Sequence, residues 1–171
     1  MSSAPVSNSD RTLTVTTIRV TVHTQGFFFD CDTRSSNHAS IFLIAGPSKS
    51  IRLNMIKAGT TDTMGTYTET SCPYIQSVSS LHDIDVVAAP GLTVGRFLDV
   101  VHQKGLNKYE LHYTGVGCRY WVKSVIEAFE SAGFIDPSSP VSASQVAHDL
   151  EYNYTKNNDR EHDPIRPGKF V

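Results

Sequence analysis

The chain has 171 residues, of which 39% are hydrophobic and 19% are charged, which is typical of one ordinary globular domain. Its formal net charge of -2 provides no broad basic surface, so nucleic acid is not expected as a partner. No stretch approaches the roughly 18 consecutive apolar residues of a membrane span, so no membrane span is expected.

The first eleven residues, MSSAPVSNSDR, are polar and predict a disordered arm at residues 1–11, ahead of a single domain over residues 12–171. The arm lacks the basic start and the apolar core of a secretory signal, which favours a cytoplasmic protein. The three cysteines, Cys31, Cys72 and Cys118, form no CxxC pair. They predict free thiols in a reducing compartment, with neither a disulfide framework nor a bound metal.

The first half of the chain has the patterns of strands. Residues 12–24 alternate valine and isoleucine with threonine, which is typical of a strand with one buried face. The apolar patterns at residues 39–45 and 51–55 flank Gly46 and Pro47 and predict a hairpin with a tight turn. Weaker strand patterns follow at residues 66–70, 75–79 and 84–89.

The second half has the patterns of helices. Apolar residues at spacings of three and four predict a helix over residues 94–105 and another over residues 118–133. An alternating strand at residues 108–114 leads into this second helix, and a capping pattern at Ser142 starts a last helix that ends near Tyr154. This order predicts an α+β domain in which an antiparallel sheet packs against the cysteine-bearing helix.

Cys118 is a candidate nucleophile. It follows Gly115 and Gly117 and begins the predicted helix, where free backbone N–H groups and the positive end of the helix dipole stabilise a thiolate. A free cysteine is also among the most frequently buried residues, so packing as a small apolar side chain is the alternative interpretation.

A thiolate nucleophile needs a base or a cation beside it, and seven histidines are candidates for this role. His38 begins a predicted apolar strand, where a sheet could hold its ring rigidly beside the start of the cysteine helix. His112 is only six residues from Cys118, but the turn between them would have to fold back. The others are predicted at a strand end, in loops or on polar helix faces: His23, His82, His102, His148 and His162.

The order of these residues resembles that of the circularly permuted papain-like thiol enzymes, which include the permuted NlpC/P60, lecithin:retinol acyltransferase-like and PPPDE proteins. The stretch NHASIFL at residues 37–43 resembles their histidine strand, and GCRYW at residues 117–121 resembles the start of their cysteine helix. The chain is more closely similar to a fungal family of uncharacterised domains with NHW-like, SVRLNM-like and GCRYW-like blocks. Ala39 stands where that family usually has an aromatic residue, which bears on the shape of the pocket.

The resemblance implies a papain-like (permuted NlpC/P60-like) arrangement with Cys118 as the nucleophile and His38 as the base. The third catalytic residue would come from residues 50–55, where Arg52 and Asn54 share a face because they are two apart. Asn54 is the better orienting residue, since its carbonyl accepts an imidazole N–H, whereas Arg52 suits an anionic substrate group or a developing oxyanion. The predicted substrate-binding residues are Arg52, Trp121, Arg119 and His112.

Several of these residues also have a purely structural interpretation. His38 could hydrogen-bond a loop, and Arg52 and Asn54 could form the polar face of a half-exposed strand. Trp121 is most simply a core residue, because it lies on the apolar stripe of its helix.

Together the residues predict a cytoplasmic thiol enzyme, without a cofactor, that hydrolyses or transfers an acyl group at an amide, ester or thioester through an acyl-cysteine intermediate. Its substrate would be a small-molecule or peptide acyl compound. The alternative is a non-catalytic small-molecule-binding or protein-interaction domain that retains a papain-like frame around a packed Cys118. A third hypothesis is metal binding through His148, Glu151 and His162. The sequence leaves the oligomeric state open.

Overall fold

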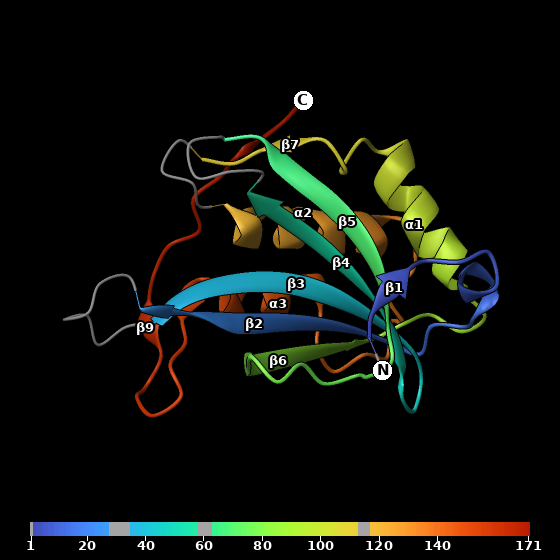
Figure 1. Ribbon diagram of the computed structural model, residues 1–171, viewed down its shortest axis with the longest axis horizontal. Coiled ribbons are helices and arrows are strands. Elements are labelled where there is room, and N and C mark those ends of the chain that lie inside the picture. Colours follow the sequence, from blue (N-terminus) through green and yellow to red (C-terminus); the bar gives the residue numbers. More distant parts are fainter. Residues whose placement is uncertain (1, 28–34, 58–62, 113–116) are drawn as a thin grey trace.

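The computed structural model describes residues 2–27, 35–57, 63–112 and 117–171, and these form an α+β fold (Figure 1). Within them, six strands make one antiparallel sheet in the order β1-β5-β4-β3-β2-β6. The helices α2 and α3 lie on the same face of the sheet, and α1 lies beyond one end of it (Figure 1). The predicted α+β class and antiparallel sheet are therefore confirmed.

The strands of the sheet are β1 (Ala4–Pro5), β2 (Thr17–Phe27), β3 (Ser35–Gly46), β4 (Lys49–Lys57), β5 (Gly65–Cys72) and β6 (Ser80–Val87). The helices are η1 (Asp10–Thr12), α1 (Val94–Gln103), α2 (Cys118–Ser131) and α3 (Ala143–Asp149). Two short antiparallel pairs join β7 (Tyr109–Glu110) to β10 (Lys169–Phe170) and β8 (Tyr152–Asn153) to β9 (Glu161–His162).

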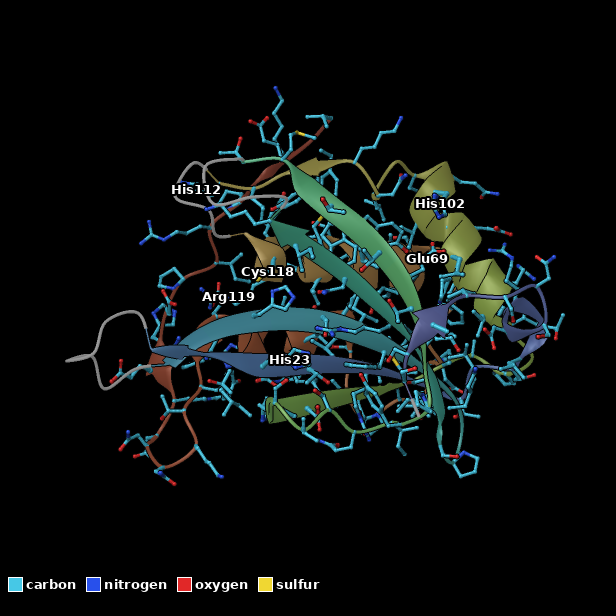
Figure 2. The ribbon with its side chains drawn as sticks, in the orientation of Figure 1. His23, Glu69, His102, His112, Cys118 and Arg119 are labelled. Carbon is cyan, nitrogen blue, oxygen red and sulfur yellow. The ribbon has the colours of Figure 1, made fainter. Side chains whose placement is uncertain are left out.

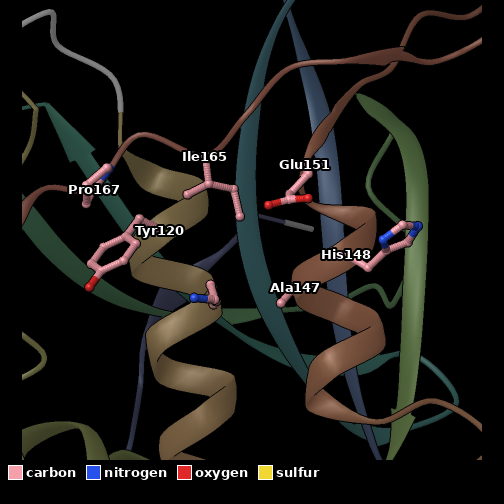
Figure 3. A pocket seen from close by; sticks show the side chains of 7 residues that line it. Tyr120, Ala147, His148, Glu151, Ile165 and Pro167 are labelled. Carbon is pink, nitrogen blue, oxygen red and sulfur yellow. The ribbon is translucent and has the colours of Figure 1, made fainter.

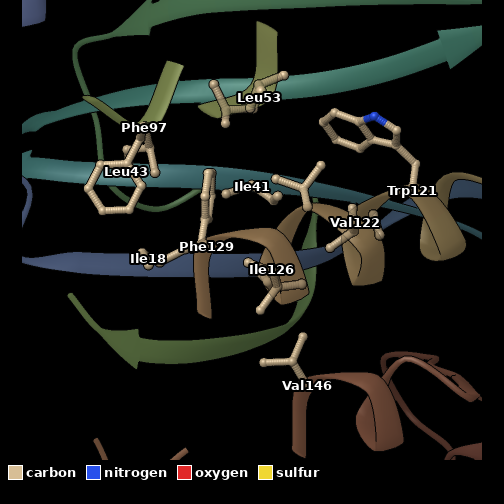
Figure 4. Close-up of a cluster of buried hydrophobic side chains, with 14 of the residues drawn as sticks. Ile18, Ile41, Leu43, Leu53, Phe97, Trp121, Val122, Ile126, Phe129 and Val146 are labelled. Atoms are coloured by element: carbon tan, nitrogen blue, oxygen red, sulfur yellow. The ribbon is translucent and has the colours of Figure 1, made fainter. Parts of the chain in front are cut away.

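The core lies between α2 and one face of the sheet. Side chains alternate along a strand, so each strand places every second residue on this apolar face. The sheet contributes fully buried side chains that include Ile18, Val20, Ile41, Leu43, Ile51 and Leu53. The stripe of α2 is also fully buried and consists of Trp121, Val122, Val125, Ile126 and Phe129 (Figure 4). Each such side chain stabilises the fold by about 1.5–3 kcal/mol on burial, so the stripe anchors α2 firmly on the sheet.

The opposite face of the sheet, here called the outer face, is polar and is partly covered by residues 73–79. This crossing segment connects β5 to β6, which lie on opposite sides of β4, β3 and β2. It is held by the Ser50 hydroxyl, which donates to the carbonyl of Tyr74 at 2.5 Å, and by Arg19, which donates to the carbonyl of Ile75 at 2.7 Å. The prediction of a strand at residues 75–79 is wrong, because a segment that spans the sheet cannot also pair along it.

The N-terminal residues belong to the fold, in contrast to the disordered arm that their polar composition predicts. Ala4 and Pro5 pair with β5 as its outer neighbour. Asp10 is buried and forms an ion pair with Lys49 at 2.8 Å. Burial raises the pKa of Asp10, but hydrogen bonds to Lys49 and Ser7 outweigh it and lower this pKa to about 2. Tertiary contacts thus order a segment that has little apolar surface of its own.

Other predicted elements differ from the structure mainly at their ends. The hairpin at Gly46 and Pro47 is confirmed, whereas the first strand begins at Thr17 instead of residue 12. The predicted strand at residues 108–114 is reduced to β7, and its residues 113–114 lie outside the described residues. The last helix ends at Asp149 and not near Tyr154. In the described ranges, no helix has the length and apolar character needed to cross a membrane.

Candidate active site

The ladder between β3 and β4 ends before the strands do. It runs from Gly46 and Lys49 as far as Ile41 and Leu53. Beyond that point, within the described residues, β4 pairs only with β5 and β3 only with β2. Figure 1 shows the two strands diverging where α2 begins. Backbone groups of β3 at this opening therefore need partners other than β4.

The start of α2 is shaped by Gly117 and Tyr109. Gly117 is the residue before the helix and has a φ of 133°, a conformation that favours glycine. The buried hydroxyl of Tyr109 donates to the Gly117 carbonyl at 2.9 Å and accepts from the N–H of Gly168 at 2.8 Å. Because the N-cap residue Gly117 has no side chain that could accept from the helix, it leaves the positive field of the first N–H groups of α2 to Cys118.

The thiol of Cys118 lies at the opening between β3 and β4. Cys118 is half-buried, and Figure 2 shows it at the start of α2. Hydrogen bonding with the His38 side chain and with the backbone N–H of Ala39 lowers the pKa of the Cys118 thiol, which places both groups close to the sulfur.

His38 is held between Cys118 and Asn54. Both His38 and Asn54 are buried, with exposed fractions of 7% and 8%, and the His38 Nε2 lies 2.5 Å from the Asn54 Oδ1. An amide oxygen only accepts, so this contact places the proton on Nε2. The other ring nitrogen, Nδ1, then has no proton in the neutral ring. Cys118, His38 and Asn54 thus form a row from the start of the helix to β4.

The electrostatics of the pair favour a thiolate beside an imidazolium. Burial opposes both charges, because it raises the pKa of the Cys118 thiol and lowers that of the His38 ring. The hydrogen bond and the charge attraction between the two groups outweigh burial. The net result is a lowered pKa for Cys118 and a raised pKa for His38, with a smaller contribution from the Asn54 hydrogen bond.

A second buried histidine, His23, supports His38 and was missed by sequence reasoning. The two residues are direct partners in the register of β2 and β3, and their rings stack with centroids 6.1 Å apart. His23 is hydrogen-bonded to Ser40 at 2.6 Å and to Ser79 of the crossing segment at 2.8 Å. Burial, then the charges of Arg52 and His38, lowers the pKa of His23 to about 4, so this ring is neutral near pH 7.

A signal for His23 does exist in the sequence. Arg19, Thr21 and His23 alternate with the buried valines of the same strand, which places His23 on the polar face. Its position opposite His38 depends on the register of two strands, and the sequence pattern of one strand does not contain that register.

Two of the predicted substrate-binding residues have structural contacts instead. Trp121 has no exposed area, and its indole N–H donates to the carbonyl of Leu106 at 2.7 Å. Arg119 donates to the carbonyls of Leu150 and Asp163, both at 2.8 Å, and pairs with the Asp163 carboxylate at 3.0 Å. Trp121 is therefore a core residue, and Arg119 fastens the C-terminal segment to the first turn of α2.

The other two predicted substrate-binding residues lie close to the site. Arg52 is half-buried on β4, two residues from Asn54 and on the same outer face. His112 is half-buried, and its backbone nitrogen is beside Gly117, where a Cβ would come within 3.3 Å of it. Arg52 is thus next to the row of Cys118, His38 and Asn54, and His112 is next to the start of α2.

A hollow of about 410 Å³ lies elsewhere, between α2, α3 and the C-terminal segment (Figure 3). It is lined by Tyr120, Lys123, Ala147, His148, Glu151, Ile165 and Pro167. None of Cys118, His38 and Asn54 lines it. The row and this hollow are therefore two different places on the molecule, and Cys118 belongs to the row.

The metal hypothesis receives no support from this part of the molecule. His162 lies 3.9 Å from the Glu151 carboxylate, while His148 and His162 both contact the ring of Tyr152 edge-on. Across the described ranges, no three histidine, cysteine, aspartate or glutamate side chains are grouped to hold one metal ion.

Comparison with protein families identifies one domain family in the chain. Residues 18–171 match the family model described as "Domain of unknown function (DUF7770)". The chain belongs to this family. No curated protein and no solved structure matches the chain. The expected membership of an uncharacterised domain family is therefore confirmed, and the DUF7770 domain includes Cys118, His38 and Asn54.

Proposed function

We propose that this DUF7770 domain is a cytoplasmic thiol enzyme with a papain-like (permuted NlpC/P60-like) arrangement. It hydrolyses or transfers an acyl group at an amide, ester or thioester. The observation that carries the proposal is the row in which the half-buried Cys118, at the start of a helix, lies beside the buried and hydrogen-bonded pair of His38 and Asn54. A nucleophile, a base and a residue that orients the base are the parts that acyl transfer through cysteine needs.

In the first step, the Cys118 thiolate attacks the acyl carbon. A C–S bond forms, and the electrons of the carbonyl double bond move onto its oxygen. The imidazolium of His38 then gives its proton to the leaving nitrogen, oxygen or sulfur as the bond from that atom to the acyl carbon breaks. The products are an acyl-cysteine thioester and a neutral His38.

In the second step, neutral His38 takes a proton from water or from another acceptor, which attacks the thioester carbon. The C–S bond breaks and returns the electron pair to sulfur, which restores the thiolate and the imidazolium. Hydrolysis and transfer differ only in the acceptor, so one site supports both. The Asn54 oxygen holds the ring in place through both steps by accepting its Nε2–H.

The oxyanion of each step needs hydrogen-bond donors close to the nucleophile. The backbone N–H of Cys118 begins α2, and the N-cap residue Gly117 provides no side chain to cap that end of the helix. An oxygen that develops charge next to the cysteine sulfur is therefore near a free N–H and the positive end of the helix dipole.

The alternative is a binding or interaction domain in which Cys118 is an inert packing residue. In that case the sulfur would be surrounded by apolar atoms and its pKa would be raised by burial. The contacts of the sulfur with the His38 ring and the Ala39 N–H support the enzyme over this alternative.

The pH dependence of Cys118 alkylation by iodoacetamide tests the proposal. We expect wild-type Cys118 to react well below the free-cysteine pKa of about 8.5, and His38→Ala to lose this advantage. Peptide mapping by mass spectrometry separates Cys118 from Cys31 and Cys72, and Cys118→Ser confirms the assignment. A Cys118 that is inert in the folded protein, or whose profile ignores His38, would overturn the proposal.

A further inference from the structure

The outer face next to the catalytic row contains one arginine in a central position. Arg52 lies on β4 opposite Phe42 of β3 and Thr70 of β5. It is two residues from Asn54, which is a distance of about 6.6 Å along a strand. Its side chain and that of Asn54 point to the same face. Any compound that reaches Cys118 over the outer face therefore comes close to this guanidinium.

The guanidinium of Arg52 is not neutralised within the described residues. No carboxylate pairs with it there, no hydrogen bond is formed by it, and its Nε is buried without a partner. It lies over the Phe42 ring, with 5.7 Å between the guanidinium carbon and the ring centroid. A buried donor without a partner is costly, and an arriving acceptor would remove that cost.

Arg19 on the same face shows what a structural arginine looks like in this protein. Its guanidinium donates to both carboxylate oxygens of Asp85, at 2.7 and 2.9 Å, and to the Ile75 carbonyl. Arg19 thus uses its donors to hold β6 and the crossing segment. Arg52 holds no element in this way, although it occupies the more central strand.

The charge of Arg52 acts on the groups around the site. It opposes protonation of His23 and His38 and makes ionisation of Tyr74 easier, so its field reaches all three rings. The terminal N–H groups of a guanidinium that lies over an aromatic ring can still bind the two oxygens of a carboxylate or a phosphate.

We propose that Arg52 binds an oxyanion group of the substrate, so that the acyl compounds accepted at Cys118 carry a carboxylate or a phosphate near the acyl carbon. This inference rests on the proposed thiol-enzyme function and adds the substrate class to it. The anion would bind the N–H edge of Arg52 on the outer face, with the acyl carbon directed at the sulfur.

Two alkylating reagents that differ in one group test this inference. In both iodoacetate and iodoacetamide, the Cys118 thiolate attacks the methylene carbon, a C–S bond forms, the C–I bond breaks and iodide leaves. Only iodoacetate has a carboxylate. We expect the ratio of the iodoacetate rate to the iodoacetamide rate to exceed that of a free thiol, and to fall about tenfold in Arg52→Met.

Matched variants separate a specific site from general charge. Arg19→Met removes the same charge from the same face, but from an arginine already paired with Asp85, and should leave the ratio unchanged. Arg52→Lys keeps the positive charge but lacks the two parallel donors of a guanidinium, so it should retain part of the preference for iodoacetate. In wild type, acetate or inorganic phosphate should protect Cys118 saturably, and the more effective anion identifies the group that is bound.

The outcomes distinguish this inference from the function on which it rests. If Arg52→Met leaves the reagent ratio unchanged and neither anion protects wild-type Cys118, the oxyanion site is wrong. The proposed function would still stand in that case if the reaction of Cys118 with iodoacetamide depends on His38. If Cys118 is inert to both reagents in wild type, the proposed function and this inference both fail. The anion-protection experiment uses only the wild-type protein, so it remains valid even if a variant fails to fold.

Discussion

Asn54 determines how His38 can act, because its Oδ1 accepts the Nε2–H at 2.5 Å in a buried setting. Without this acceptor, a buried N–H has no partner and the ring loses its fixed orientation. The amide of asparagine is neutral, so it orients the His38 ring without placing a second negative charge beside it. The positive charge of the pair therefore stays available to Cys118.

We expect Asn54→Ala to slow the alkylation of Cys118 by iodoacetamide at least about tenfold at a pH well below 8.5. The reason is that a hydrogen bond to a charged group is worth about 1.5–3 kcal/mol. Asn54→Asp retains an acceptor and should react much faster than Asn54→Ala. Rates measured across a pH series would contradict this role if the alanine variant had the wild-type profile.

The beginning of α2 depends on the glycine before it. The φ of Gly117 is 133°, and a Cβ there would lie 3.0 Å from the Tyr109 hydroxyl and 3.3 Å from the His112 nitrogen. The conformation and the crowding act together, since Tyr109 is itself fixed between Gly117 and Gly168. The position of the Cys118 sulfur relative to His38 is set at this point of the helix.

We expect Gly117→Ala to reduce the free energy of unfolding by about 2 kcal/mol or more and to slow Cys118 alkylation as well. Gly133, just beyond the other end of α2, has a φ of +77° with open space around its Cα. Gly133→Ala should therefore cost about 1–2 kcal/mol without any change in alkylation. Urea unfolding and alkylation rates measure both effects, and equal alkylation in the two variants would contradict the prediction.

Over the whole molecule, the buried His23 on the outer face makes stability depend on pH. His23 has a pKa of about 4 in the folded protein and an ordinary value of 6.5, mainly because of burial. Between these two values the unfolded chain binds a proton that the folded chain does not, so stability falls as the pH falls. The pKa of Cys118 is lowered and that of His38 is raised, so these two groups contribute to the pH dependence of stability with opposite signs.

We expect His23→Gln to flatten the loss of stability between pH 6.5 and about 4 by on the order of 2 kcal/mol, because glutamine does not titrate there. The exposed His148 provides the control, and His148→Gln should leave the slope unchanged. Urea unfolding at a series of pH values measures this. A His23→Gln protein with the wild-type slope would show that His23 is not buried as a neutral ring.

The sequence by itself determined the local elements and one candidate chemical group. The spacing of apolar residues predicts α2 and its buried stripe, and Gly46 and Pro47 predict the hairpin. The position of Cys118 at a helix start makes it the candidate thiol. Such features depend on residues a few positions apart, where periodicity and backbone preference act directly.

Only the tertiary structure decided which groups meet. It placed His23 against His38 through the register of β2 and β3, turned residues 75–79 into part of the crossing segment, and ordered the N-terminal residues along β5. It also assigned Trp121 to the core and left Arg52 without a counter-charge among the described residues. These outcomes depend on contacts between distant parts of the chain, and the pattern of a single segment does not contain them.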